Sequence, residues 1–198
     1  DPREEVRQRP AEPEAADRIV VFGGDGTVHA VVNAMPDAEI AIVPCGSGND
    51  FVKTLGIPCD AGRALAIAKG PARAVDVVEF ECGARKGRFI NIAEVGFGAR
   101  VVQLATKMRP VTGRKISYQL GILTALAGHG LRPLKLEIDG RHVGDYLMTN
   151  LIVANGQYFG SGMRPMPDAR PDDGLLDIAV MNEFSRWKIL RNAKVLRT

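Results

Sequence analysis

An acid set among glycines is the part of this sequence best suited to chemistry. Asp25 stands in the run Gly23-Gly24-Asp25-Gly26-Thr27. Glycine has no Cβ, so this backbone can take positive φ angles and approach a ligand closely. A helix that begins here would also direct free N–H groups and its positive dipole end at a phosphate. A carboxylate beside a phosphate repels it unless the carboxylate serves a metal ion or a proton, so Asp25 needs a chemical explanation.

The residues on both sides of this run predict a strand, a glycine turn and a helix. Positions 19–22 form a continuous apolar run, which is typical of a buried strand. Thr27 is placed to cap a helix, since Ser and Thr side chains often accept hydrogen bonds from the first turn. The apolar residues that follow have helical spacing and are Val28, Val31, Val32 and Met35.

A second glycine turn repeats this order. A predicted strand over Ala38 to Val43 leads into Cys45-Gly46-Ser47-Gly48-Asn49-Asp50, and a short helix follows from Phe51. Turns at the ends of neighbouring strands share one crevice in α/β folds, so we expect the two turns to lie together. Asn49 and Asp50 are also common helix caps, so capping and nucleotide contact both remain open.

Composition limits the class of protein. The chain has 198 residues, 45% of them hydrophobic, a formal charge of +3 and three cysteines. It has no apolar run of about eighteen residues and no signal-peptide pattern, so we expect a soluble, cytoplasmic protein with reduced thiols. The small charge allows peripheral attraction to an anionic membrane and does not indicate a nucleic-acid partner. The oligomeric state stays open, a homodimer included.

The pattern along the chain predicts two domains, with a boundary near residue 74. Residues 1–73 read as an incomplete α/β nucleotide-binding domain, because almost nothing before position 19 can supply the strands that a parallel sheet needs. Residues 74–198 read as a mostly antiparallel β-sandwich-like domain with one or two helices. Its predicted strands cover 74–80, 88–93, 134–138, 146–154 and 175–181, and its helices 99–108 and 115–127. Asp139-Gly140 is predicted to form a tight hairpin turn. We expect a loop or short helix over 1–17, a basic amphipathic helix or strand over 184–198, and truncation at both ends.

Further motifs give the chain a resemblance to a known family. Asn91 to Gly96, Pro167-Asp168-Ala169 and Asp172-Asp173-Gly174-Leu175-Leu176-Asp177 follow the two glycine turns in order. This set resembles the bacterial diacylglycerol kinase and lipid kinase family, relatives of sphingosine kinases. The resemblance implies an ATP-dependent kinase that phosphorylates a lipid hydroxyl in a cleft between two domains. The first motif alone is shared with NAD kinases, which remain an alternative.

The resemblance also implies roles for particular residues. Asp25 would face the reacting phosphoryl group or magnesium, and it is the only candidate proton acceptor on a matched motif. A structural magnesium ion would bind at Arg170, Asp173 and Leu175, the first and last through main-chain oxygens. Asp172 and Asp173 are also ordinary turn residues, so the structural reading stays open. The nucleotide phosphates would contact Gly23, Gly24, Asp25, Gly26, Thr27, Val28, His29, Ser47, Gly48 and Asn49.

The chain departs from the family pattern at several places. The family usually has an Asn-Glu pair where this chain has His29-Ala30, and many members carry an Asp where Gly98 stands. A later Asp-Gly-Glu motif, whose acid is a proposed proton acceptor, has no counterpart here. These departures favour a second alternative, a noncatalytic fragment that binds nucleotide or lipid. Arg109, Arg114 and Lys115 are expected to form a basic loop that faces a membrane, an acidic substrate or solvent.

Overall fold

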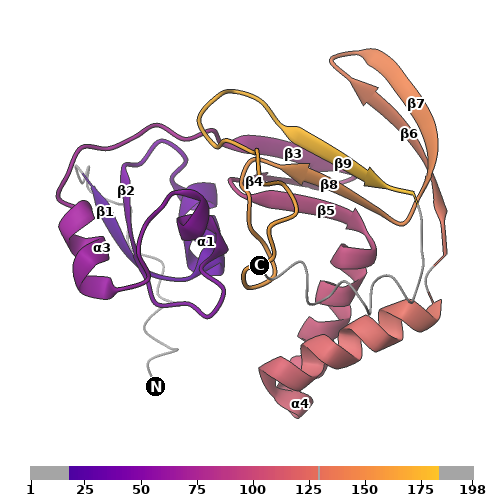
Figure 1. Cartoon of the computed structure of the whole chain (residues 1–198), viewed down its shortest axis with the longest axis horizontal. Helices are drawn as coiled ribbons and strands as arrows, with labels where there is room; N and C mark the ends of the chain where they lie inside the picture. The colour runs from indigo at the N-terminus through magenta and orange to yellow at the C-terminus, as the bar shows by residue number, and fades with distance from the viewer. Residues whose placement is uncertain (1–17, 129, 183–198) are drawn as a thin grey trace.

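The computed structural model describes residues 18–128 and 130–182, and its first elements form a parallel strand pair (Figure 1). β1 (Ile19–Gly23) pairs with β2 (Ile40–Pro44), with Gly23 opposite Pro44, so both glycine turns leave the same edge. Helix α1 (Asp25–Ala34) connects the strands. The predicted apolar spacing is confirmed because Val28 and Val32 are buried. They pack in a core with Val21, Ile42, Phe51, Val52 and Ile90.

Two short helices complete this α/β part. Helix α2 (Asp50–Thr54) follows the second glycine turn, and α3 (Ala61–Ile67) contacts β2. Asp60 caps α3, because its side chain accepts a hydrogen bond of 2.8 Å from the Arg63 N–H. The expected strand, turn and helix order is therefore confirmed twice, followed by a third helix.

Antiparallel strands dominate the rest of the chain, as the sequence predicts. β3 (Val78–Cys82) pairs with β4 (Arg85–Phe89), and β6 (Arg132–Ile138) pairs with β7 (Arg141–Met148). A three-stranded sheet has the order β5 (Ile92–Gly96), β8 (Asn150–Ala154) and β9 (Asp177–Met181). Asp139 and Gly140 have φ values of 51° and 73°, which confirms the tight turn predicted between β6 and β7.

Strand boundaries are where the sequence predictions were wrong. The strand expected over 88–93 is divided between β4 and β5, and the one expected over 146–154 is divided between β7 and β8. In both cases the chain changes its pairing partner inside a continuous strand-like pattern, and such a pattern carries no sign of the partner. The strands expected from 74 and 175 begin only at Val78 and Asp177.

Both predicted helical patterns lie within α4 (Phe97–Gly128), which consists of two helices joined by a kink. The kink is at Gly113, where φ is 73° and ψ is 172°, and Pro110 precedes it. Figure 1 shows the two helices below the three-stranded sheet in this view. Among the described residues, no helix combines the length and the hydropathy needed to cross a bilayer.

A buried asparagine joins three segments of the β-rich part. Asn155 is fully buried, and its side-chain amide donates to the carbonyls of Asp76 and Ile90 at 3.0 and 2.8 Å. Its backbone N–H donates to Asn91 at 2.8 Å. Asn155 thus connects the end of β8 to Asp76 and to the segment between β4 and β5. The domain boundary near residue 74 itself stays a prediction. The elements expected over 1–17 and 184–198 lie outside the described residues.

Candidate active site

The first glycine turn runs directly into α1. The helix begins at Asp25, with Gly24 as its N-cap residue and no side-chain cap. The prediction that Thr27 caps this helix was therefore wrong, because Thr27 already lies in the first turn and its N–H donates to the Gly24 carbonyl at 3.0 Å. The Thr27 side chain instead packs over Gly23, where a Cβ would lie 2.5 Å from Thr27 Oγ1. A helix start without a side-chain cap leaves N–H groups for a ligand.

The two glycine turns touch through their backbones, as expected from neighbouring parallel strands. A Cβ built on Gly46 would lie 2.5 Å from the Cα atom of Gly24, so neither position has room for a side chain. The side chain of Asn49 donates to the Gly46 carbonyl at 2.8 Å, while its buried Oδ1 has no hydrogen-bond partner among the described residues. An open backbone cradle with an unpaired buried oxygen fits contact with a nucleotide.

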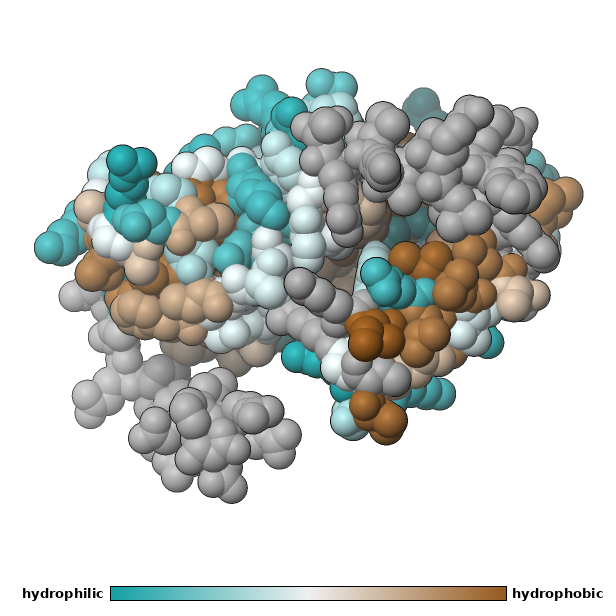
Figure 2. Space-filling model, turned by 60° about the horizontal axis from the view of Figure 1, so that its bottom comes forward, coloured by the Kyte–Doolittle hydropathy of each residue, from teal (hydrophilic) through white to brown (hydrophobic). Residues whose placement is uncertain are grey.

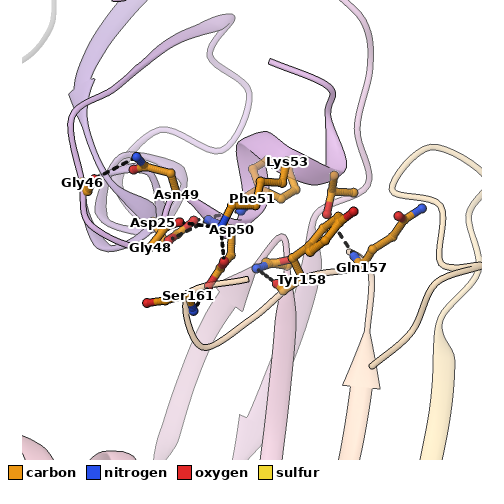
Figure 3. Close-up of polar contacts among 12 residues, drawn as sticks. Asp25, Gly46, Gly48, Asn49, Asp50, Phe51, Lys53, Gln157, Tyr158 and Ser161 are labelled. Atoms are coloured by element: carbon orange, nitrogen blue, oxygen red, sulfur yellow. Dashed lines mark hydrogen bonds and ion pairs between the residues drawn. The ribbon is translucent and has the colours of Figure 1, made fainter. Parts of the chain in front are cut away.

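Asp25 caps the second helix rather than its own. Its two carboxylate oxygens accept hydrogen bonds from the backbone N–H groups of Asp50 and Phe51, at 3.1 and 2.9 Å (Figure 3). These groups begin α2, so the carboxylate satisfies two N–H groups that the helix itself cannot pair. Asn49 is the N-cap residue of α2 but makes no side-chain cap bond. The carboxylate of Asp25 therefore joins the two turns, and each oxygen still has a second lone pair.

A third loop closes over the second turn. The buried carboxylate of Asp50 accepts a hydrogen bond of 2.7 Å from the Ser161 N–H and pairs with Lys53 at 2.8 Å. Ser161 lies between Gly160 and Gly162, and all three residues have positive φ angles. Figure 3 shows this loop approaching Gly48 from the β-rich part. Asp50 thus connects the two parts of the molecule at the candidate site.

A cleft of about 270 Å³ opens beside Asp25. Its wall includes Gly26, His29 and Phe51 from the α/β part, and Asn91 and Ile92 from the β-rich part. A larger cleft of about 490 Å³ lies between the segment from Pro36 to Ile42 and the segment from Ile67 to Val77, and none of the glycine-turn residues lines it. We assign the site to the smaller cleft, because only this one includes residues of the first glycine turn and the acid.

Comparison with known proteins identifies the family. A model of the diacylglycerol kinase catalytic domain matches residues 2–80, and a model of the YegS C-terminal NAD kinase beta sandwich-like domain matches residues 91–198. The chain belongs to the diacylglycerol kinase and lipid kinase family. The resemblance inferred from the glycine turns and the later motifs is thereby confirmed, as is the expected fold, an α/β part followed by antiparallel sheets.

Individual relatives of this lipid kinase family agree with that result. The Pseudomonas aeruginosa (strain UCBPP-PA14) protein named "Probable lipid kinase YegS-like" is 33% identical over 82% of this chain and 54% of its own length. The Mycobacterium tuberculosis (strain H37Rv) protein named "Diacylglycerol kinase" is 31% identical over 88% and 58%. A solved diacylglycerol kinase structure from Bacillus anthracis str. Sterne has a TM-score of 0.62 at 32% identity, covering 85% of this chain and 55% of that chain. The chain thus spans little more than half the length of these relatives.

The residues predicted to bind magnesium form a turn that does not line the cleft beside Asp25. Asp173 Oδ1 accepts a hydrogen bond of 3.1 Å from the Leu175 N–H, and Asp76 Oδ2 accepts one of 2.8 Å from the Gly174 N–H. Arg170 pairs with Asp172 at 3.7 Å, and all residues from 172 to 176 are exposed. The carboxylates of Asp76 and Asp173 thus lie at neighbouring backbone N–H groups. Both offer the oxygen donors that Mg²⁺ prefers, so the turn fits the metal. Within the described ranges, no three acidic, histidine or cysteine side chains form a metal cluster.

Glu94 in β5 is a half-buried acid that the sequence interpretation missed. Its Oε1 accepts a hydrogen bond of 2.9 Å from Asn150, and a Cβ on Gly98 would lie 2.4 Å from that oxygen. Burial raises the pKa of Glu94, and the Asn150 hydrogen bond lowers it by less. A carboxylate thus occupies the space beside position 98, where many family members carry Asp and this chain has Gly. Only the pairing of β5 with β8 brings Glu94 and Asn150 together.

Replacing Glu94 with glutamine is expected to stabilise the protein increasingly as the pH rises from 4.5 to the raised pKa of the Glu94 carboxyl, and by a constant amount above it. In the unfolded chain Glu94 loses its proton near its ordinary value of 4.5, whereas burial raises its pKa in the fold. Ionisation therefore favours the unfolded state in this pH range, and a neutral amide removes that penalty. Urea unfolding of both proteins at several pH values measures the difference. Glu137→Gln, at an exposed ion pair with Lys135, is the control; a pH-independent difference for Glu94→Gln would contradict the prediction.

Proposed function

We propose that this chain forms part of an ATP-dependent lipid kinase, which transfers the γ-phosphoryl group of ATP to a lipid hydroxyl such as that of diacylglycerol. The observation that carries the proposal is the contact between the two glycine turns, at the starts of α1 and α2 and beside Asp25. Family membership supports the lipid acceptor, because relatives are named as lipid or diacylglycerol kinases.

The backbone of the two turns supplies the phosphate site. Residues Gly23 to His29 would hold the phosphates at the start of α1, where the helix dipole and unpaired N–H groups favour an anion. Ser47, Gly48 and Asn49 would complete the nucleotide contact from the second turn. Magnesium bound with the nucleotide would neutralise charge on the phosphoryl oxygens, and Asp25 would face it. A structural magnesium ion would be held separately by Arg170, Asp173 and Leu175, with Asp76 beside them.

Asp25 has two compatible roles in this proposal. Its hydrogen bonds to α2 hold the second turn against the first, which is a positioning role. Asp25 also lines the cleft, where its carboxylate would accept the proton of the lipid hydroxyl or face the metal. Positioning and charge neutralisation account for most of the catalysis of phosphoryl transfer, and a positioned base adds on the order of a hundred- to ten-thousand-fold.

A competition assay tests the acceptor. The protein is incubated with radiolabelled ATP, magnesium, dispersed diacylglycerol and NAD, and the label is followed into organic and aqueous phases. We expect a labelled lipid in the organic phase. Label in a phosphorylated dinucleotide only would instead identify an NAD kinase, the alternative that the shared first motif leaves open. ATP binding without any transfer would support a noncatalytic binding domain.

A further inference from the structure

Positive charge is concentrated in one continuous part of the chain. Residues 95–136 contain no Asp or Glu, although they include seven cations: Arg100, Lys107, Arg109, Arg114, Lys115, Arg132 and Lys135. The remaining residues carry 19 Lys and Arg against 23 Asp and Glu, a formal charge of −4, in a chain whose total is +3. α4 and the start of β6 thus form a basic region on an otherwise acidic molecule.

The outer face of α4 is apolar. In its second helix Ile116, Leu120 and Leu123 have the spacing of one helical face and are 55%, 37% and 58% exposed. The opposite face carries the small residues Gly121 and Ala125, both buried. A Cβ on Gly121 would lie 2.9 Å from the Val101 carbonyl, so the two helices of α4 pack closely there. The helix pair therefore packs closely through these small residues, while Ile116, Leu120 and Leu123 stay exposed.

The bend of α4 carries an exposed apolar side chain beside exposed cations. Val111 is 89% exposed and directly follows Pro110 at the bend. Lys107 and Arg109 precede it on the last turn of the first helix, and both are exposed. An isolated apolar side chain this exposed gains nothing from water, whereas long basic side chains beside it can reach past an apolar layer to charged groups.

We propose that α4 is a docking surface for an anionic lipid bilayer. Figure 2, turned so that the α4 side comes forward, shows hydrophobic side chains gathered there beside hydrophilic ones. A bilayer with anionic headgroups matches both features, since it offers negative charge to the cations and an apolar layer to Val111, Ile116 and Leu123. An acidic protein or nucleic acid would match only the charge.

The proposal rests on the proposed function, because it names the surface through which a lipid kinase would meet its membrane-borne acceptor. It is nevertheless tested without ATP. Vesicle binding measures the surface alone, so a failure to bind vesicles and a failure to transfer phosphate are distinguishable.

Vesicle sedimentation of the 198-residue chain tests this surface. We expect binding to phosphatidylcholine vesicles that contain phosphatidylglycerol, little binding to phosphatidylcholine alone, and weaker binding as the salt concentration rises. Lys107→Glu and Arg109→Glu are each expected to weaken binding by at least about fivefold. Val111→Asp and Leu123→Asp are each expected to weaken it by roughly tenfold, because each removes an apolar group from the contact.

Matched substitutions outside α4 show whether a loss of vesicle binding comes from this surface or from any change in charge or hydrophobicity. Val143→Asp changes an apolar residue that is 49% exposed in β7, and Arg85→Glu reverses an exposed charge in β4; both should bind vesicles like the unmodified chain. Circular dichroism melting shows that each variant is folded. Three results would overturn the proposal: equal binding to neutral vesicles, unchanged binding by the Val111 and Leu123 variants, or displacement from anionic vesicles by RNA at equal charge concentration.

Discussion

Replacing Gly46 with alanine is expected to lower the free energy of unfolding by about 2–3 kcal/mol and to weaken ATP binding at least tenfold. The added Cβ would lie 2.5 Å from the Gly24 Cα and 2.6 Å from Asn49 Oδ1. Backbone atoms cannot rotate away as a flexible side chain can, so the two glycine turns would have to separate. Urea unfolding measures the loss of stability, and isothermal titration calorimetry with ATP measures the loss of affinity.

Gly26→Ala is the matched control for this prediction. It lies in the same pair of turns, yet a Cβ there would meet no atom within 4 Å. Gly26 is also inside α1, where alanine is favoured over glycine by up to about 1 kcal/mol. The free energy of unfolding of the Gly26→Ala protein should therefore stay the same or rise. Equal destabilisation by both substitutions would show that the contact between the turns does not determine stability.

Replacing Asp25 with alanine is expected to lower the free energy of unfolding by about 2–3 kcal/mol. The change removes both acceptors from the N–H groups of Asp50 and Phe51, which then begin α2 without partners. The second turn would also lose its connection to the first, so ATP affinity should fall with stability. Asp37→Ala, at an exposed acid after α1, is the control and should change the stability by less than about 0.5 kcal/mol.

Asp25→Asn separates the positioning role from the chemical one. The amide oxygen can still accept one of the two hydrogen bonds, so most of the stability and ATP affinity should remain, while the negative charge is lost. If Asp25 accepts a proton or faces the metal, turnover should fall on the order of a hundredfold or more. Unchanged turnover in a stable Asp25→Asn variant would leave Asp25 with the capping role alone.

Local patterns account for the features that the sequence predicted well. The order of strand, glycine turn and helix follows from apolar spacing and from glycine runs, which act within a few residues. The same holds for the Asp139-Gly140 turn and for both helices of α4. Strand ends were predicted less well, because whether residues near Asn91 or Thr149 end one strand and begin another depends on partners distant in sequence.

The sequence by itself determined the family, the two glycine turns and the presence of an acid among them, since residue types at fixed spacing carry all three. Only the tertiary structure decided what that acid contacts. Asp25 meets N–H groups 25 and 26 residues away, and Asp50 meets one 111 residues away. The tertiary structure also decided which face of α4 is exposed, because this depends on the face through which its two helices pack. Such contacts depend on how distant segments pack, which short-range patterns do not record.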